Sequence, residues 1–105
     1  MKVTVLCFDV SDNAMGRAAL LARALQRRFN VEIIGPSRTG EVWAPMKDWS
    51  VPVRSFPWAR YPTFQAHARA GVYAADGDVL LAAKARPTSF GLALRRKALT
   101  GVPVI

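Results

Sequence analysis

Apolar residues along the chain gather into short runs that alternate with longer segments of helical spacing. Five runs have the composition of β-strands: residues 3–8, 31–34, 51–56, 78–84 and 102–105. The first and fourth runs are apolar at nearly every position, which is typical of strands buried on both faces of a parallel sheet. The third run alternates and contains Pro52, which cannot donate to a β-ladder, so we expect this strand at a sheet edge.

Three segments repeat apolar residues at the spacing of an amphipathic helix. They cover residues 14–29, 62–75 and 88–99. In the first helix the spacing predicts a buried face of Ala18, Leu21, Ala22, Leu25 and Phe29. In the third helix it predicts an inner face of Phe90, Ala93, Leu94 and Ala98. Leu92 and Leu99 then point away from that face, where we expect missing residues or a partner chain to cover them.

The alternation of strands and helices predicts an α/β fold, a Rossmann-like three-layer domain with a parallel sheet of about five strands. The expected strand order is 3-2-1-4-5. The chain has 105 residues, about half of them hydrophobic, which fits a single domain over residues 1–105. The connection of residues 37–50 has no helical period, and a loop of this length in a compact domain is usually functional or mobile.

Charge and composition limit the classes of function. The net charge is +8, from fifteen Lys and Arg against seven Asp and Glu. A basic surface attracts phosphates on nucleic acid, on anionic lipid or on a small ligand, and otherwise keeps a protein dissolved. We expect the single cysteine, Cys7, to be a core residue in a reducing, cytoplasmic environment, and we expect neither a signal peptide nor a membrane span. Because His67 is the single histidine, neither a His-rich metal site nor a classical catalytic triad can be assembled.

Parallel sheets of this kind bind ligands beyond the carboxyl ends of the strands, where the strand order reverses. Here that point lies between the first and fourth strands. The loop after the first strand contains four candidate ligand-binding residues: Ser11, Asn13, Gly16 and Arg17. The helix that follows presents unpaired N–H groups to an anion, Gly16 permits close approach, and Arg17 can pair with a phosphate or carboxylate. The alternative is that Ser11 and Asn13 only cap the helix.

The segment after the fourth strand contains the other four candidates: Lys84, Arg86, Thr88 and Ser89. Two cations at the end of a buried strand, followed by hydroxyl groups at a helix start, suit an anionic or polyhydroxy ligand. The alternative is two solvated cations and a helix cap. The chain contains no G-x-G-x-x-G pattern, so a dinucleotide is not indicated. We expect the aromatic residues around the third strand to cover a sheet edge: Trp43, Trp49, Trp58 and Tyr61.

Several stretches together resemble the start of GT-B glycosyltransferases of the glycosyl transferase group 1 type. They are the opening KVTVLC at residues 2–7, the loop SDNAMGR at residues 11–17 with its Leu- and Ala-rich helix, and VEIIG at residues 31–35. The stretch KARPTSFG at residues 84–91, followed by a helix, is also similar to that family. The resemblance covers essentially the whole chain.

The resemblance implies the N-terminal one of two Rossmann-like domains that face a common cleft. In this family the N-terminal domain takes the sugar acceptor, the C-terminal domain takes the nucleotide sugar, and catalysis is generally independent of a bound metal. Asn13, Gly16, Lys84 and Arg86 would then face the cleft, although this loop has one glycine where many members have a pair. Because these 105 residues fit one Rossmann-like domain and not two, we expect no cofactor, no metal and no activity on this chain alone, and the catalytic residues stay unassigned.

Two other functions stay open beside an acceptor-side glycosyltransferase domain. One is a free-standing module that binds a small anionic ligand in the same crevice. The other is a basic domain that docks as a peripheral protein on an anionic membrane surface, or that docks on nucleic acid. Nucleic acid is the less favoured of these two partners, because the chain has no recognition motif for RNA or DNA. The basic residues available for docking are Arg23, Arg27, Arg28, Arg95, Arg96 and Lys97. An open sheet edge also invites self-association.

Overall fold

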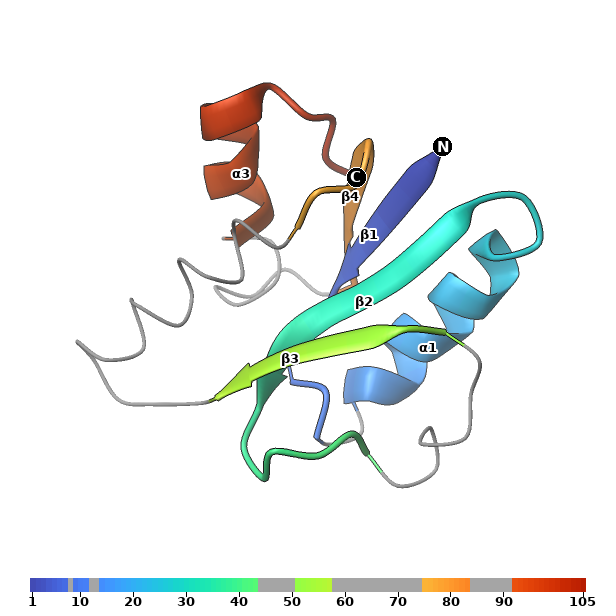
Figure 1. The fold of residues 1–105 in the computed structure, drawn as a ribbon, viewed down its shortest axis with the longest axis vertical. Coiled ribbons are helices and arrows are strands. Elements are labelled where there is room, and N and C mark those ends of the chain that lie inside the picture. The colour runs from blue at the N-terminus through green and yellow to red at the C-terminus, as the bar shows by residue number, and fades with distance from the viewer. Residues whose placement is uncertain (8, 12–13, 44–50, 58–74, 84–91) are drawn as a thin grey trace.

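A computed structural model describes the chain except for residues 8, 12–13, 44–50, 58–74 and 84–91. Its strands are β1 (Lys2–Leu6), β2 (Asn30–Ser37), β3 (Val53–Pro57) and β4 (Val79–Ala82). Its helices are α1 (Ala14–Leu25) and α3 (Leu92–Thr100). The strands form a parallel sheet in the order β3-β2-β1-β4 (Figure 1), so the predicted α/β, Rossmann-like fold is confirmed.

The final residues lie where the sequence predicts a fifth strand, beside β4. They form an isolated parallel bridge, Leu80 with Val104, and not a full strand. The Leu80 N–H donates to the Pro103 carbonyl at 2.9 Å, and the Ile105 N–H donates to the Leu80 carbonyl at 2.8 Å. Pro103 itself has no N–H to give to the ladder. Among the described residues the sheet therefore has four strands and a bridge, in the expected 3-2-1-4-5 order.

Each face of the sheet has its own core, because neighbouring residues of a strand point to opposite faces. One face joins Val3, Val5 and Ile33 to the buried side of α1. The other face joins Leu6, Ile34, Phe56 and Leu80 to Ala93 of α3. The two described helices therefore lie on opposite faces of the sheet, as their places at the lower right and upper left of Figure 1 also show.

Helix α1 buries a slightly different side from the one its spacing predicts. Ala18 and Ala22 are fully buried and Leu25 and Phe29 are partly buried against the core, as expected, but Leu21 is 38% exposed. The buried side is completed by Met15 and Ala19 in its place. The small alanine side chains let the helix lie close to the sheet, which turns the larger Leu21 toward solvent. The regular helix ends at Leu25, and the predicted continuation to residue 29 is a hydrogen-bonded turn.

Strand β2 continues three residues beyond its predicted end at Ile34, through Gly35 and Pro36 to Ser37. Gly35 is required here, because a Cβ at this position would overlap the carbonyl oxygen of Cys7. The Pro36 carbonyl accepts a hydrogen bond from the Val10 N–H at 2.8 Å, so the proline stays in register with the chain that leaves β1.

Helix α3 turns Ala93 into the core, as predicted, but leaves Leu94 46% exposed and Ala98 exposed. The prediction of a buried face through Leu94 and Ala98 is therefore wrong, since the helix meets the sheet near its first turn only. Leu99 is 60% exposed, as its predicted outward position requires. The predicted helix at residues 62–75 falls almost wholly outside the described residues, as does Phe90, and the side chain of Leu92 is not described. In the part of the chain that is described, no helix has the length and apolar character needed to cross a membrane.

Candidate functional site

The carboxyl ends of β1 and β4 lie side by side, which is the arrangement that the predicted crevice depends on. Leu6 pairs with Ala82 in the parallel ladder, and the Ala83 N–H donates to the Leu6 carbonyl at 3.1 Å. The loop after β1 and the segment after Ala83 therefore start from neighbouring positions at one edge of the sheet. Of the predicted site residues, Ser11, Gly16 and Arg17 lie within the described part of the chain. The others, namely Asn13, Lys84, Arg86, Thr88 and Ser89, lie outside the described residues.

Ser11 organises the loop after β1 around a buried carboxylate. Its hydroxyl donates to Asp9 Oδ1 at 2.5 Å, and its backbone N–H donates to the same oxygen at 2.9 Å. The Ser11 hydroxyl also accepts a hydrogen bond from the Arg38 N–H at 3.0 Å. Ser11 therefore ties the end of β1 to the end of β2.

Asp9 is the most buried charged side chain at this edge, with none of its surface exposed. Its second oxygen, Oδ2, lies 3.1 Å from Arg38 Nε, and none of the described groups makes a well-formed hydrogen bond to it. A buried carboxylate needs a nearby positive charge, and Arg38 supplies it. The Arg38 side chain is 62% exposed, so it also reaches solvent at the edge where ligands bind in this fold.

Asp9 and Arg38 are not among the residues that the sequence predicts for the site. Arg38 directly follows β2 and Asp9 lies three residues after the end of β1, and the carboxyl ends of adjacent parallel strands meet at one edge. The position of Arg38 at the end of a strand could not be predicted, because β2 was expected to end at Ile34 and not at Ser37.

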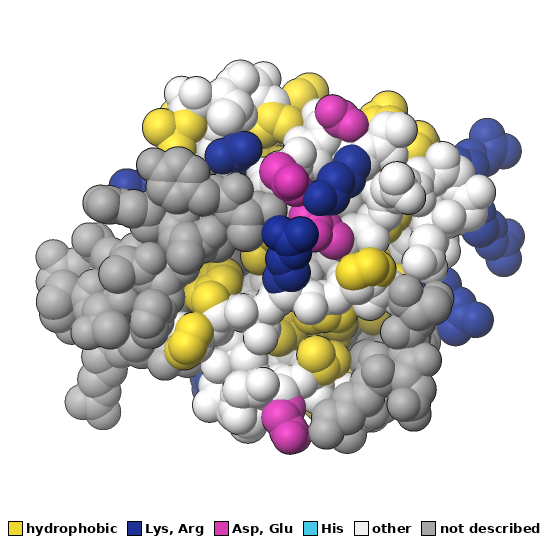
Figure 2. Space-filling model, in the orientation of Figure 1, with side chains coloured by type: hydrophobic (Ala, Val, Ile, Leu, Met, Phe, Trp, Pro, Cys, Tyr) yellow, Lys and Arg dark blue, Asp and Glu magenta, His cyan; other side chains and the backbone are white. Residues whose placement is uncertain are grey.

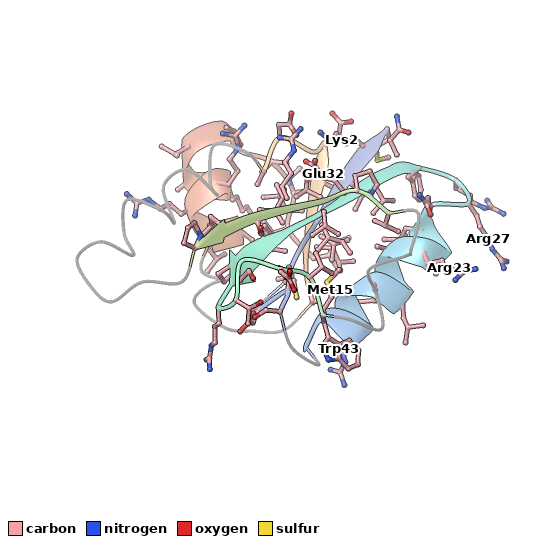
Figure 3. The ribbon with its side chains drawn as sticks, turned by 60° about the horizontal axis from the view of Figure 1, so that its bottom comes forward. Lys2, Met15, Arg23, Arg27, Glu32 and Trp43 are labelled. Atoms are coloured by element: carbon pink, nitrogen blue, oxygen red, sulfur yellow. The ribbon has the colours of Figure 1, made fainter. Side chains whose placement is uncertain are left out.

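Gly16 lies in the first turn of α1, beneath the ring of Trp43. A Cβ added at Gly16 would come within 3.2 Å of the Trp43 ring. The tryptophan is held there by its backbone N–H, which donates to the Val10 carbonyl at 2.7 Å. Figure 3 shows Trp43 beside the start of α1, near the inward-pointing Met15. Trp43 therefore covers the start of this helix and not a sheet edge, and a ligand that approaches Gly16 closely would have to displace its ring.

Arg17 is exposed on the outer side of α1, one residue beyond Gly16. The neighbouring Met15 and Ala18 point into the core, and helical geometry turns Arg17 away from them. Its charge therefore lies near the amino end of α1 but outside the contacts that join Asp9, Ser11 and Arg38.

A groove of about 290 Å³ opens beside Arg38, between the carboxyl ends of β2 and β3. It is lined by Ser37, Arg38, Gly40, Ser55, Phe56 and Pro57. Gly40 has a φ of +81°, a left-handed conformation that turns the chain back after β2. The Ser37 hydroxyl closes this turn by donating to the Glu41 carbonyl at 2.7 Å. The groove places hydroxyl, guanidinium and apolar surface together, a combination that suits a small polar ligand.

A second charged cluster lies on the α3 face of the sheet, around Lys2. Lys2 Nζ lies 2.6 Å from Asp76 Oδ1 and 3.1 Å from Oε1 of the buried Glu32, and Arg54 Nε lies 3.4 Å from Glu32 Oε2. The hydrogen bond between Lys2 and Asp76 raises the pKa of the lysine and lowers the pKa of the carboxyl. Figure 2 shows acidic and basic side chains side by side on this face. The charges neutralise one another, so we assign this cluster to the fold and not to ligand binding.

The described residues contain no group of three or more His, Cys, Asp or Glu side chains that could hold a metal ion. Comparison of the chain with protein-family models, with curated proteins and with solved structures gave no match. The candidate site is the carboxyl edge of the sheet, where Asp9, Ser11 and Arg38 meet.

Proposed function

We propose that this chain is the acceptor-side, N-terminal domain of a GT-B glycosyltransferase and binds a sugar acceptor at the carboxyl edge of its sheet. The parallel order β3-β2-β1-β4 supports the proposal, because it is compatible with the Rossmann-like domain that the resemblance implies. Sugar transfer from a nucleotide sugar would then require a second, donor-binding domain, and the chain alone would be inactive.

One observation carries the proposal: the ends of β1 and β4 are neighbours, joined by the hydrogen bond from the Ala83 N–H to the Leu6 carbonyl. Residues 84–91, which resemble the family, follow Ala83 directly in the sequence. The loop that contains Ser11 leaves from the adjacent strand. Two segments that the resemblance assigns to one cleft thus begin at one edge of the sheet.

The groups at this edge suit a polyhydroxy ligand. Sugar hydroxyls both donate and accept hydrogen bonds, and they are bound best by carboxylates, hydroxyls and guanidinium groups held in fixed positions. Asp9 contacts the Arg38 side chain and Ser11 accepts the Arg38 N–H, so both hold Arg38 in place, and Phe56 and Pro57 contribute to the lining of the groove beside it. A free-standing module for an anionic ligand is the second candidate, because the exposed Arg38 guanidinium also suits a phosphate or carboxylate.

The test is a titration of the isotope-labelled chain, followed by the backbone amide signals in NMR spectra. The probes are neutral monosaccharides and inositol, their phosphates, and inorganic phosphate. We expect the neutral sugars or inositol to shift the amide signals of Ser11, Arg38 and Ala83. The amide signals of Asp78, at the far end of the sheet, and of Gly101, after α3, should be unaffected and serve as controls.

The outcomes separate the two candidates. Shifts with inorganic phosphate alone would support the free-standing anion-binding module and overturn the acceptor domain. An absence of shifts with all probes would overturn both. In a parallel assay, the chain is incubated with a nucleotide sugar and each acceptor that binds. Transfer by the chain alone would contradict the requirement for a second domain.

A further inference from the structure

The outer side of α1 combines exposed apolar surface with positive charge. This surface, the α1 outer face, consists of Arg17, Leu20, Arg23 and Ala24 of α1 together with Arg27 of the turn that follows the helix. All five are exposed, and Leu20 retains 63% of its accessible surface. A shallow groove of about 360 Å³ runs along it. The face lies opposite the buried side of the helix, so the fold itself leaves a leucine at the point farthest from the core.

The charge on this face has one sign. Helix α1 contains no acidic residue, and Arg27 and Arg28 are exposed in the turn just after its end. Figure 3 shows Arg23 on α1 and Arg27 just beyond its end, both extending away from the sheet. In Figure 2, basic side chains project from the right-hand margin, where Figure 1 places the end of α1 and the start of β2.

The basic residues of α3 do not extend this surface. The two helices pack on opposite faces of the sheet, so Arg95 and Lys97 lie on the other side of the molecule. A docking surface formed by both helices is therefore ruled out, and the α1 outer face has to act by itself.

We propose that the α1 outer face docks on an anionic lipid surface, with the helix lying parallel to the membrane. The arginines pair with lipid phosphates, and Leu20 enters the boundary between headgroups and acyl chains. Charge complementarity selects an anionic partner, and the central exposed leucine selects lipid over nucleic acid, because a phosphate backbone offers no apolar layer to receive it. With one leucine and a few cations the attachment is reversible and sensitive to salt.

The experiment measures binding of the whole chain to vesicles of phosphatidylcholine mixed with phosphatidylglycerol, with pure phosphatidylcholine vesicles as the reference. We expect binding to the mixed vesicles only, and release as the salt concentration rises. Each arginine near an anionic surface contributes about fivefold in affinity, so Arg23→Gln/Arg27→Gln should weaken binding about 25-fold. Leu20→Gln should weaken it as well, without lowering the unfolding midpoint, because the side chain is exposed.

The matched control removes the same charge from the opposite side of the molecule. Arg95→Gln/Lys97→Gln, both at exposed positions of α3, should leave vesicle binding within about twofold of the original chain. Equal loss in this control would mean that total charge and not the α1 outer face drives binding, and would overturn the proposal. Binding to duplex DNA as tight as to vesicles, unaffected by Leu20→Gln, would overturn it in favour of nucleic acid. The sugar titration is independent of these results, because its reporter residues lie at the carboxyl edge of the sheet.

Discussion

Asp9 and Arg38 show how a single contact can join two loops that lie far apart in the sequence. The carboxylate of Asp9 has no exposed surface, and its charge is balanced by the guanidinium of Arg38, whose side chain is 62% exposed. The two partners of such a pair contribute unequally to stability. Removing the exposed partner leaves a buried charge without compensation, whereas after removal of the buried charge the arginine can be hydrated. The pair therefore holds the loop after β1 in place at the proposed ligand edge.

We expect Asp9→Asn to destabilise the fold by about 1–3 kcal/mol, because an amide N–H₂ would then face either the Ser11 N–H or Arg38. The measurement is the free energy of unfolding from urea titration. In a double-mutant cycle with Arg38→Gln, the two changes together should cost less than the sum of the single changes. Asp78→Asn is the control, since that side chain is exposed and its amide oxygen can still accept the Lys2 N–H. If the Asp9→Asn variant has the same free energy of unfolding as the original chain, the contact between Asp9 and Arg38 does not hold the loop.

At the scale of elements, helix orientation depends on which small residues can approach the sheet. In α1, alanines take the positions against the strands and Leu21 turns outward. In α3, Ala93 is fully buried beside Leu80, while the larger Leu94 points away. In both helices, alanines that the spacing predicts to be buried lie in the core, whereas a leucine predicted beside them, Leu21 or Leu94, is exposed. Close packing of helix on sheet favours small side chains at the contact.

We expect losses of stability of different size from changing two neighbouring positions of α3. Ala93→Leu forces extra methylene groups into a filled core and should cost about 1–3 kcal/mol. Leu94→Ala removes a half-exposed side chain and should cost less than about 1 kcal/mol, partly because alanine favours the helix. Urea unfolding curves of both variants test the orientation of α3. A larger loss for Leu94→Ala than for Ala93→Leu would contradict it.

For the whole molecule, the Lys2 cluster links parts of the chain that are 74 residues apart, namely the start of β1 and the segment before β4. The same parallel order that brings β1 and β4 together creates both this cluster and, at the other end of the strands, the proposed ligand edge. The two ends differ in charge balance, since acids and bases neutralise each other around Lys2, whereas Arg38 and Arg17 are exposed at or near the ligand edge.

The pKa changes of the Lys2–Asp76 pair give stability a defined dependence on pH. The pKa of Asp76 is lowered, so its contribution is present above its ordinary value of 3.8 and is lost as the pH falls through the lowered value. The pKa of Lys2 is raised, so its contribution is present below 10.5 and is lost as the pH rises through the raised value. Because the pair is partly exposed, Asp76→Asn should cost about 1 kcal/mol or less at neutral pH.

Unfolding midpoints of the original chain and of Asp76→Asn, measured across the pH range, test this expectation. The difference between them should be constant near neutrality and should close at both extremes. A difference that persists below the lowered pKa of Asp76 would show that the carboxylate charge is not what stabilises the pair.

The pattern of apolar residues was sufficient to predict the α/β class, the parallel order and the adjacency of the first and fourth strands. Apolar runs bounded by turn residues decide which segments can be buried, and right-handed crossovers leave few ways to connect them. The same reasoning placed Ser11 at the carboxyl edge. Residues 84–91 and Asn13, which complete the predicted site, lie outside the described residues, so their part in it stays a prediction.

Tertiary structure alone decided the contacts that depend on exact register and on distant packing. Arg38 meets Asp9 because β2 extends to Ser37, which the turn-like pair Gly35 and Pro36 concealed in the sequence. Trp43 covers Gly16 because a hydrogen bond to Val10 returns its loop to α1. Local periodicity indicates which positions of an element face the core. It does not indicate which distant side chain packs beside them, because that depends on the packing of the whole chain.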